Sequence, residues 1–185
     1  MAPRTVTVHG RRPEWKVVLD TYAVPDDRRS AAQVVLTVTL YVLGLVACGL
    51  ALRVGYWLTL LLAVPTALML VRVFTLVHET SHRSMFSRPR TNVAVGIALS
   101  VLVATPFHQW ARRHALHHAT SGDLDRRGWW EIPTLTVAEY RGSSLKARAA
   151  YRAQRTTSLL FTVLATSFFL VLQRFGAPGA SRRER

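Results

Sequence analysis

Long runs of apolar residues alternate with short arginine-rich segments along this chain. Residues 31–52 contain no charged residue, and residues 56–77 form a second run that only Pro65 and Arg72 interrupt. A helix of about 20 residues spans the roughly 30 Å hydrocarbon core of a bilayer. The two runs therefore predict two transmembrane helices joined by a tight hairpin.

Shorter apolar runs follow. Residues 93–107 are too few to span a bilayer, so we expect an interfacial or half-penetrating helix there. Residues 157–172 are just long enough to span. Before the first long run, the basic residues 1–30 are expected to contain a short interfacial helix over residues 15–22. Thr136-Val137-Ala138-Glu139 fits a capping box and predicts the start of another short helix.

These runs predict an all-α membrane protein, a transmembrane helical bundle of about three spans with an interfacial half-helix. We expect a cytoplasmic lead-in over residues 1–30, a membrane domain over residues 31–175 and a basic tail over residues 176–185. Arginines after the second run place this boundary, its histidines and the N-terminus in the cytoplasm by the positive-inside rule. If residues 157–172 formed a third span, the basic tail would lie outside the cytoplasm. This conflict predicts that residues 157–172 do not span alone or that a fourth helix is missing.

The chain is strongly basic, with 24 Lys and Arg against 10 Asp and Glu and a net charge of +14. Such a balance raises the possibility of nucleic-acid binding. Here the arginines flank apolar runs instead of forming a stripe with interleaved aromatic residues, so we expect no nucleic-acid partner. Trp129 and Trp130 fit anchors at the membrane interface. The single cysteine, Cys48, lies in an apolar run and cannot form an intrachain disulfide.

Two clusters of histidines directly follow apolar runs. His78 and His82 are four residues apart, whereas His114, His117 and His118 follow an i, i+3, i+4 pattern. Each spacing places its imidazoles on one helix face. Imidazole binds iron, copper and zinc, so the ligand type alone does not select the metal. Five imidazoles exceed what one catalytic zinc uses, and they predict a site with two metal ions.

One cluster allows a different interpretation. His78-Glu79-Thr80-Ser81-His82 matches the pattern of zinc proteases in which two histidines bind zinc and a glutamate acts as general base. A membrane-embedded zinc metalloprotease is therefore the alternative function. It requires a third ligand downstream and leaves the cluster at His114 unexplained. A degenerate membrane protein that keeps the histidines without turnover is a further alternative.

The two clusters resemble the first two histidine boxes of membrane fatty acid desaturases. His78-x-x-x-His82 corresponds to the first box and His114-x-x-His117-His118 to the second. The run from Trp110 to Gly128 is similar to the bacterial acyl-lipid branch, and residues 134–140 continue a likeness that covers nearly the whole chain. Glu79 stands where the family more often has aspartate. Hydroxylases and ketolases carry related boxes.

The resemblance implies an oxygen-dependent oxidoreductase of lipid metabolism. Its two iron ions would use O2 as co-substrate to introduce a double bond into an acyl chain of a membrane lipid or another carrier. A ferredoxin or a b-type cytochrome would supply electrons. The chemistry is consistent with this, because an unactivated C–H bond has no acidic proton and no leaving group for side chains to work on.

The resemblance also assigns roles to particular residues. By that assignment the metal ligands would be His78, His82, His114, His117 and His118. Three further residues, His108, Asp123 and Asp125, are candidates for orienting the ligand imidazoles through hydrogen bonds. His108 alternatively fits a ligand or a surface residue, and the two aspartates equally fit pairing with Arg126 or Arg127, or capping a turn.

One feature of the family pattern is missing. The family has a third box, His-x-x-His-His, whereas this chain has no histidine after His118. Five ligands cannot complete two iron ions. We therefore expect a C-terminally incomplete desaturase that is inactive by itself or active only with a partner fragment.

Overall fold

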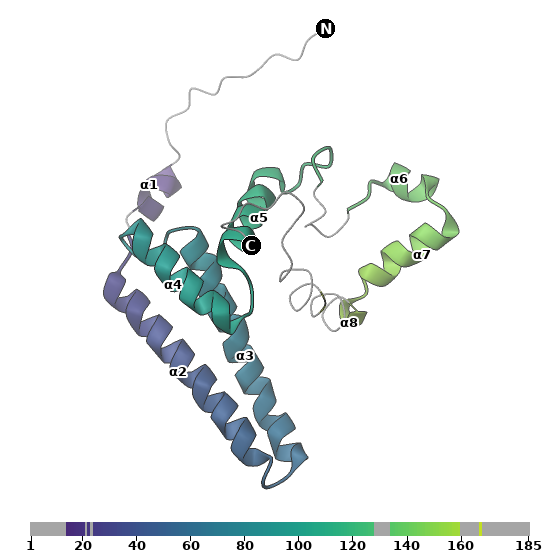
Figure 1. Ribbon diagram of the computed structural model, residues 1–185. Coiled ribbons are helices and arrows are strands. Elements are labelled where there is room, and N and C mark those ends of the chain that lie inside the picture. Colours follow the sequence, from purple (N-terminus) through teal and green to yellow (C-terminus); the bar gives the residue numbers. More distant parts are fainter. Residues whose placement is uncertain (1–13, 21, 23, 128–133, 160–166, 168–185) are drawn as a thin grey trace.

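A computed structural model describes residues 14–20, 22, 24–127, 134–159 and 167 of the 185-residue chain. Within these residues every regular element is a helix and none is a strand, as the all-α prediction requires. Figure 1 shows the helices in chain order. They are α1 (Glu14–Asp20), α2 (Asp27–Ala51), α3 (Tyr56–Ser81), α4 (Pro89–Leu102), α5 (Phe107–Thr120), α6 (Val137–Gly142), α7 (Leu145–Gln154) and α8 (Thr157–Leu159).

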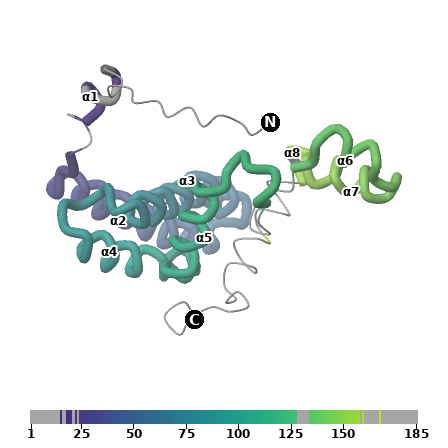
Figure 2. Tube along the Cα trace, turned by 90° about the horizontal axis from the view of Figure 1, so that it is seen from above, coloured from purple at the N-terminus to yellow at the C-terminus, as the bar shows by residue number. Residues whose placement is uncertain are grey.

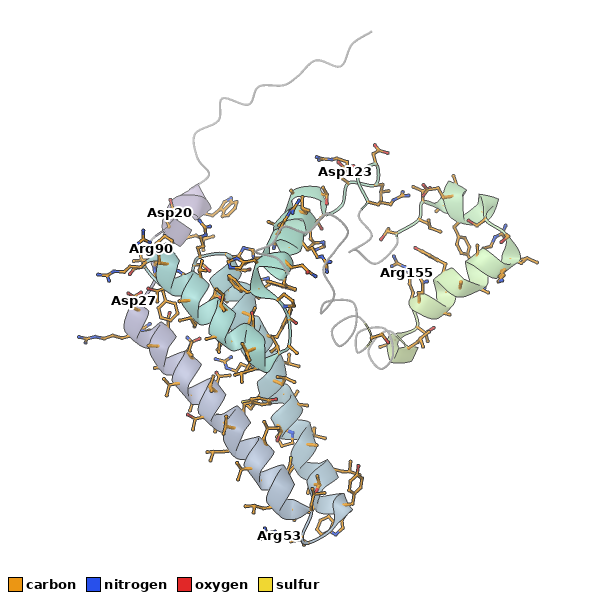
Figure 3. The ribbon with its side chains drawn as sticks, in the orientation of Figure 1. Asp20, Asp27, Arg53, Arg90, Asp123 and Arg155 are labelled. Carbon is orange, nitrogen blue, oxygen red and sulfur yellow. The ribbon has the colours of Figure 1, made fainter. Side chains whose placement is uncertain are left out.

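The two longest helices, α2 and α3, form the predicted hairpin, which turns at Arg53 (Figures 1 and 3). Both are long and apolar enough to cross a membrane. Helix α2 begins where Asp26 accepts hydrogen bonds from the backbone N–H groups of Arg28 and Arg29, each at 3.0 Å. Helix α3 continues past the apolar run and carries His78 on its last turn. The sequence prediction of two spans in this region is confirmed.

Small and polar side chains bring α2 and α3 together. A Cβ added at Gly44 would lie 2.5 Å from Thr66 Oγ1, so the glycine permits a close approach of the two helices. Nearer the histidines, Arg72 Nε donates to Thr37 Oγ1 at 3.3 Å, and the Thr37 side chain is almost fully buried. These contacts fix the register of the hairpin.

The apolar residues 93–107 do not form one continuous helix. Helix α4 ends at Leu102, and α5 begins after Pro106 at an angle of 106° to it. Ala104 adopts a left-handed conformation in the connection, with φ of 50°. Neither α4 nor α5 is long enough to span a membrane by itself. Taken together as a bent pair, they have the length and hydropathy expected of a span. The bend directs α5 across the end of α3 that carries His78.

The hydrophobic core lies at this same end of the hairpin. Seen from above, α2, α3 and α4 lie alongside one another (Figure 2). A Cβ at Gly96 of α4 would overlap the Phe107 ring and would lie 2.8 Å from Thr80 Oγ1. Glycine at this position therefore lets α5 pack directly on α3 and α4. The buried apolar residues here are Val73, Leu76, Val77, Met85, Phe86, Leu99, Phe107 and Trp110.

The loop between α3 and α4 is held from two directions. Asn92 is fully buried, and its Oδ1 accepts from the backbone N–H groups of Met85 (3.2 Å) and Phe86 (3.0 Å). Its Nδ2 donates to the Phe86 carbonyl at 2.7 Å. From α2, the Asp27 carboxylate accepts from the Ser87 backbone N–H and hydroxyl, both at 2.7 Å. The start of α2 and the loop after His82 therefore lie at the same end of the bundle.

Helices α6 and α7 lie beyond α5, away from α2 (Figures 1 and 2). The predicted capping box is confirmed: Thr136 Oγ1 accepts from the Glu139 backbone N–H, and Glu139 accepts from that of Thr136. Neither helix contains a buried residue. The predicted interface anchors Trp129 and Trp130, most of the apolar run 157–172 and the basic tail 176–185 lie outside the described residues.

Candidate metal centre

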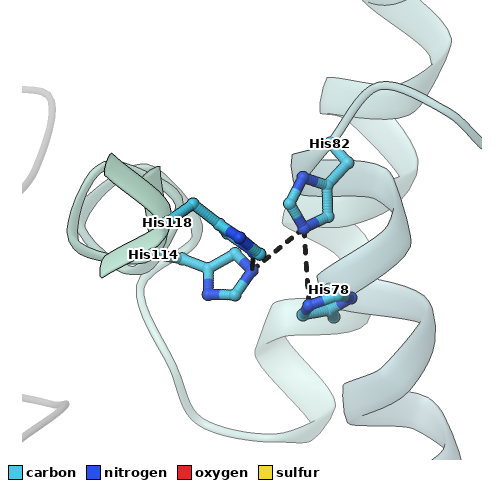
Figure 4. A group of neighbouring side chains, drawn as sticks. All are labelled: His78, His82, His114 and His118. Atoms are coloured by element: carbon cyan, nitrogen blue, oxygen red, sulfur yellow. Dashed lines mark hydrogen bonds between the residues drawn. The ribbon is translucent and has the colours of Figure 1, made fainter. Parts of the chain in front are cut away.

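Four imidazoles from two helices converge on one point (Figure 4). His78 and His82 come from the end of α3, and His114 and His118 come from α5. One nitrogen from each ring lies within 4.8 Å of the corresponding nitrogen of every other ring. His114 Nε2 is 2.9 Å from both His82 Nε2 and His118 Nε2, and His82 Nε2 is 3.4 Å from His78 Nε2.

The donor set fits a transition metal better than a set of ordinary hydrogen bonds. A neutral imidazole nitrogen carries either one proton or one lone pair. His114 Nε2 therefore cannot form good hydrogen bonds to His82 and His118 at once. A cation that accepts one lone pair from each ring would satisfy all four nitrogens together, and imidazole suits iron, copper and zinc.

The helices position these rings with buried neighbours. Trp110, one turn before His114 on α5, is 7% exposed and stacks on the His114 ring with centroids 4.6 Å apart and planes 16° apart. Phe74 of α3 contacts the Trp110 ring in a T-shaped arrangement, with centroids 5.2 Å apart. Trp110, His114 and His118 are spaced i, i+4, i+8, so they share the α5 face that meets α3.

A carboxylate and a hydroxyl lie behind His78. Glu79 Oε1 is 3.0 Å from His78 Nδ1, the ring nitrogen that does not face the other histidines. Ser84 Oγ in turn donates to the Glu79 backbone carbonyl at 3.1 Å and to its carboxylate at 3.4 Å. A hydrogen bond to Nδ1 fixes the tautomer and the orientation of a metal-binding imidazole. Glu79 is therefore placed to hold His78 Nε2 toward the cluster.

The electrostatics of the cluster favour neutral rings. Burial is the main cause that lowers the pKa of His114 to about 4, and the nearby imidazoles of His78, His118, His82 and His117 lower it further. Burial, followed by His78 and His118, also lowers the pKa of His82, against a smaller opposing effect of Glu79. At neutral pH both rings therefore offer lone pairs, as a metal ligand must.

Other candidate residues lie around this group and not within it. His117 is exposed on α5, with its ring centroid 6.2 Å from that of His114 and 6.0 Å from that of His118. His108 is exposed at the start of α5 beside Phe107. The assignment of all five boxed histidines as ligands stays a prediction.

The two candidate aspartates lie in the turn that follows α5. Asp123 accepts from Arg126 Nε at 2.7 Å and from the Asp125 backbone N–H at 3.0 Å. These bonds lower the pKa of the Asp123 carboxyl, the Arg126 bond most strongly. This is the arginine-pairing and turn-capping arrangement that the sequence also allowed. Orientation of an imidazole by Asp123 or Asp125 stays a prediction.

Two supporting residues were not identified from the sequence. Trp110 precedes His114 by four residues, so the helical spacing that grouped the histidines would also have placed the indole on their face. Glu79 was considered as a general base, although its adjacency to His78 equally allows the contact to Nδ1. Both residues lie within four positions of a clustered histidine, so the same spacing argument could have identified them.

Comparison with known proteins identifies related sequences. The sequence model of the family described as fatty acid desaturase matches residues 52–185. A "Fatty acid desaturase" from Bacillus subtilis is 38% identical over 180 residues, which cover 97% of this chain and 51% of that protein. An "sn-1 oleoyl-lipid 12-desaturase" from Anabaena variabilis is 30% identical over 104 residues, 56% of this chain and 29% of that protein.

No solved structure matches the chain. The chain spans about half the length of the Bacillus subtilis relative and a smaller share of the Anabaena variabilis relative. The family match extends over most of the sequence and includes both histidine clusters. By these matches and its helical, membrane-spanning architecture, the chain belongs to the fatty acid desaturase family.

Proposed function

We propose that this chain supplies part of the iron centre of an oxygen-dependent acyl-chain desaturase. The observation that supports this most is the convergence of four imidazoles from α3 and α5, within 4.8 Å of one another, in a chain of this family. A di-iron centre, when bound, supplies the redox power to remove hydrogen from an unactivated methylene pair with O2.

The chain's own residues would hold and orient that centre. His78, His82, His114 and His118 would provide nitrogen ligands, and the family resemblance adds His117 from the exposed side of α5. Glu79 would hold His78 in the tautomer that leaves Nε2 free to bind. Trp110 would fix the His114 ring by stacking and would keep water from its buried side.

The place of the site in the bundle supports the proposed substrate, electron donor and orientation. The histidines lie at the end of the hairpin opposite Arg53, next to the start of α2. We infer that this end faces the cytoplasm, because Arg83, Arg88 and Arg90 cluster there. An acyl chain of a membrane lipid would then reach the site from the bilayer. A ferredoxin or b-type cytochrome would deliver electrons from the aqueous side.

The contacts of Glu79 do not favour the zinc protease. A protease of the His-Glu-x-x-His type needs its glutamate free to take a proton from a metal-bound water. In this structure the Glu79 carboxylate instead contacts His78 Nδ1 and Ser84 Oγ. In addition, His114 and His118 lie beside this pair, which supports the resemblance to the desaturase boxes.

A chimeric desaturase tests the proposed function. The chain would replace the aligned half of the Bacillus subtilis desaturase, which it matches over 97% of its own length. Cells expressing the chimera should produce a new double bond in labelled acyl chains, detected by mass spectrometry. His114→Ala should abolish the product, and Leu116→Ala, an exposed position on the same helix, should not. A chimera that accumulates in membranes without producing a double bond would contradict the proposal.

A further inference from the structure

The segment that contains α6 and α7 is strongly basic. Residues 134–159 include one acidic residue, Glu139, which is already paired with Arg127 at 2.8 Å. The same pairing is the main cause that lowers the Glu139 pKa to about 2, so this carboxylate stays ionised and bound to Arg127. The basic residues of the segment are Arg141, Lys146, Arg148, Arg152 and Arg155.

Several of these cations are fixed in place by aromatic rings. Arg152 lies over the Tyr140 ring at 5.7 Å, and Arg155 lies over the Tyr151 ring at 4.9 Å. Arg148 also approaches Tyr140, at 5.8 Å, while its Nε donates to the Ser143 carbonyl at the joint between α6 and α7. Holding a guanidinium over a ring reduces the conformational entropy that it loses on binding an anion.

Exposed aliphatic side chains stand next to these cations. Leu145, the first residue of α7, is 81% exposed, and Val137, the first residue of α6, is 67% exposed. On α7 the spacing i, i+3, i+7 places Leu145 on one stripe with Arg148 and Arg152. Neither helix has a buried residue. Within the described part of the chain, this mixed apolar and basic surface therefore packs on no core.

We propose that α6 and α7 bind the surface of a bilayer rich in anionic phospholipids. Guanidinium and ammonium groups pair with lipid phosphates, and each basic residue near an anionic surface adds about 1 kcal/mol, roughly a fivefold gain in binding. The exposed leucine and valine favour a bilayer over an acidic protein, because they can enter the apolar side of the headgroup layer. The same chain carries α2 and α3, which are long and apolar enough to span a membrane and would bring this segment close to one.

This contact would have a structural consequence for the proposed metal centre. Arg127 follows α5 and pairs with Glu139 of α6, so α6 and the end of α5 are linked. Binding of α6 and α7 to the bilayer would therefore restrain the polar end of the helix that carries His114 and His118. The proposal itself does not require metal or desaturase activity.

Hydrogen–deuterium exchange of the full chain in lipid nanodiscs tests this surface. Amides of α6 and α7 should exchange about tenfold more slowly in phosphatidylcholine with about a third phosphatidylglycerol than in phosphatidylcholine alone. This difference should vanish in about 1 M salt, where the Debye length falls to about 3 Å. Equal exchange in the two lipids would overturn the proposal, as would protection that arises only when an acidic soluble protein is added.

Two matched variants separate charge from folding. The triple variant Arg141→Gln, Lys146→Gln, Arg152→Gln should lose the lipid-dependent protection, and it leaves Arg148 and its contact at the helix joint in place. The double variant Arg141→Lys, Arg152→Lys keeps the charge and should retain the protection. If both variants lost it equally, the cations would be needed for the fold of the segment and not for lipid binding, which would contradict the proposal.

Discussion

The end of the bundle that carries the histidines and the segment of α6 and α7 are stabilised in different ways. At the histidine end, a fully buried Asn92 bonds the loop backbone, and apolar side chains from α3, α4 and α5 share one core. In α6 and α7 the contacts are local caps, an ion pair and stacked arginines, all of them on exposed helices. Buried packing suits the histidine end to position the proposed ligands, and the exposed surface of α6 and α7 suits a contact with the proposed bilayer.

The largest effect is expected at Asn92, where this difference is sharpest. Asn92→Ala would leave the buried N–H groups of Met85 and Phe86 without partners and should lower the free energy of unfolding by about 4 kcal/mol. Thr91→Ala, at the neighbouring half-buried position, is the control and should be close to neutral. Unfolding in detergent micelles, followed by circular dichroism, measures both. Equal stability of the two variants would show that the loop is held by other contacts.

A methyl group at Gly96 is expected to have the next largest effect. Gly96→Ala would force the Phe107 ring and Thr80 away from α4 and should destabilise the protein by about 2 kcal/mol. Gly49→Ala in α2 is a matched control, since its Cβ would meet nothing within 4 Å. That substitution should be neutral or slightly stabilising, because alanine favours a helix. A stable Gly96→Ala protein would mean that α5 can shift without cost.

Removal of the carboxylate behind His78 should have a smaller effect, and on metal binding more than on stability. Glu79→Ala should weaken Fe²⁺ binding about tenfold by freeing His78 Nδ1, as for other partners of metal-binding imidazoles. Glu79→Gln keeps a hydrogen-bonding oxygen and should lose less. Chelator competition under anaerobic conditions measures both affinities. Unchanged affinity in Glu79→Ala would show that Glu79 does not orient His78.

The smallest effect is expected in the exposed segment and depends on pH. The Glu139 pKa is lowered to about 2 from 4.5, first by Arg127 and then by Thr136, so the folded state favours the carboxylate. Its stabilising contribution is therefore present above pH 4.5 and lost as the pH falls to about 2. As the pH falls from 4.5 to about 2, the rate at which pepsin cleaves α6 and α7 should rise in the wild type relative to Glu139→Gln. The variant should be cleaved readily at every pH in this window. Parallel pH profiles would contradict this role.

Much of the fold was predictable because hydropathy and helical spacing act locally. The apolar runs gave the bounds of α2 and α3 to within a few residues, and Thr136 with Glu139 gave the start of α6. Pro106 marks the end of the apolar residues 93–107, but the 106° bend between α4 and α5 was not predictable. It arises from a left-handed alanine, Ala104, which has no sequence signature, and from the packing of Phe107 on Gly96.

For the candidate site, spacing predicted that the histidines share faces but not which of them meet. His114, His117 and His118 are equivalent by the i, i+3, i+4 pattern, yet the crossing of α5 over α3 brings His114 and His118 to the imidazoles of α3 and leaves His117 outside this group. The crossing angle depends on side chains from three helices. Likewise, the spacing of residues along α4 does not indicate that the Asn92 side chain bonds the backbone of the preceding loop.

The central claim, that imidazoles from α3 and α5 form one metal site, is tested most directly by anaerobic Fe²⁺ binding to the purified full chain. His114 Nε2 lies 2.9 Å from the nitrogens of both His82 and His118, so His114→Ala should weaken binding at least about a hundredfold. Leu116→Ala, on the exposed side of the same helix, should bind as the wild type does. Equal affinity of the two variants, or no stoichiometric binding by the wild-type chain, would contradict the account.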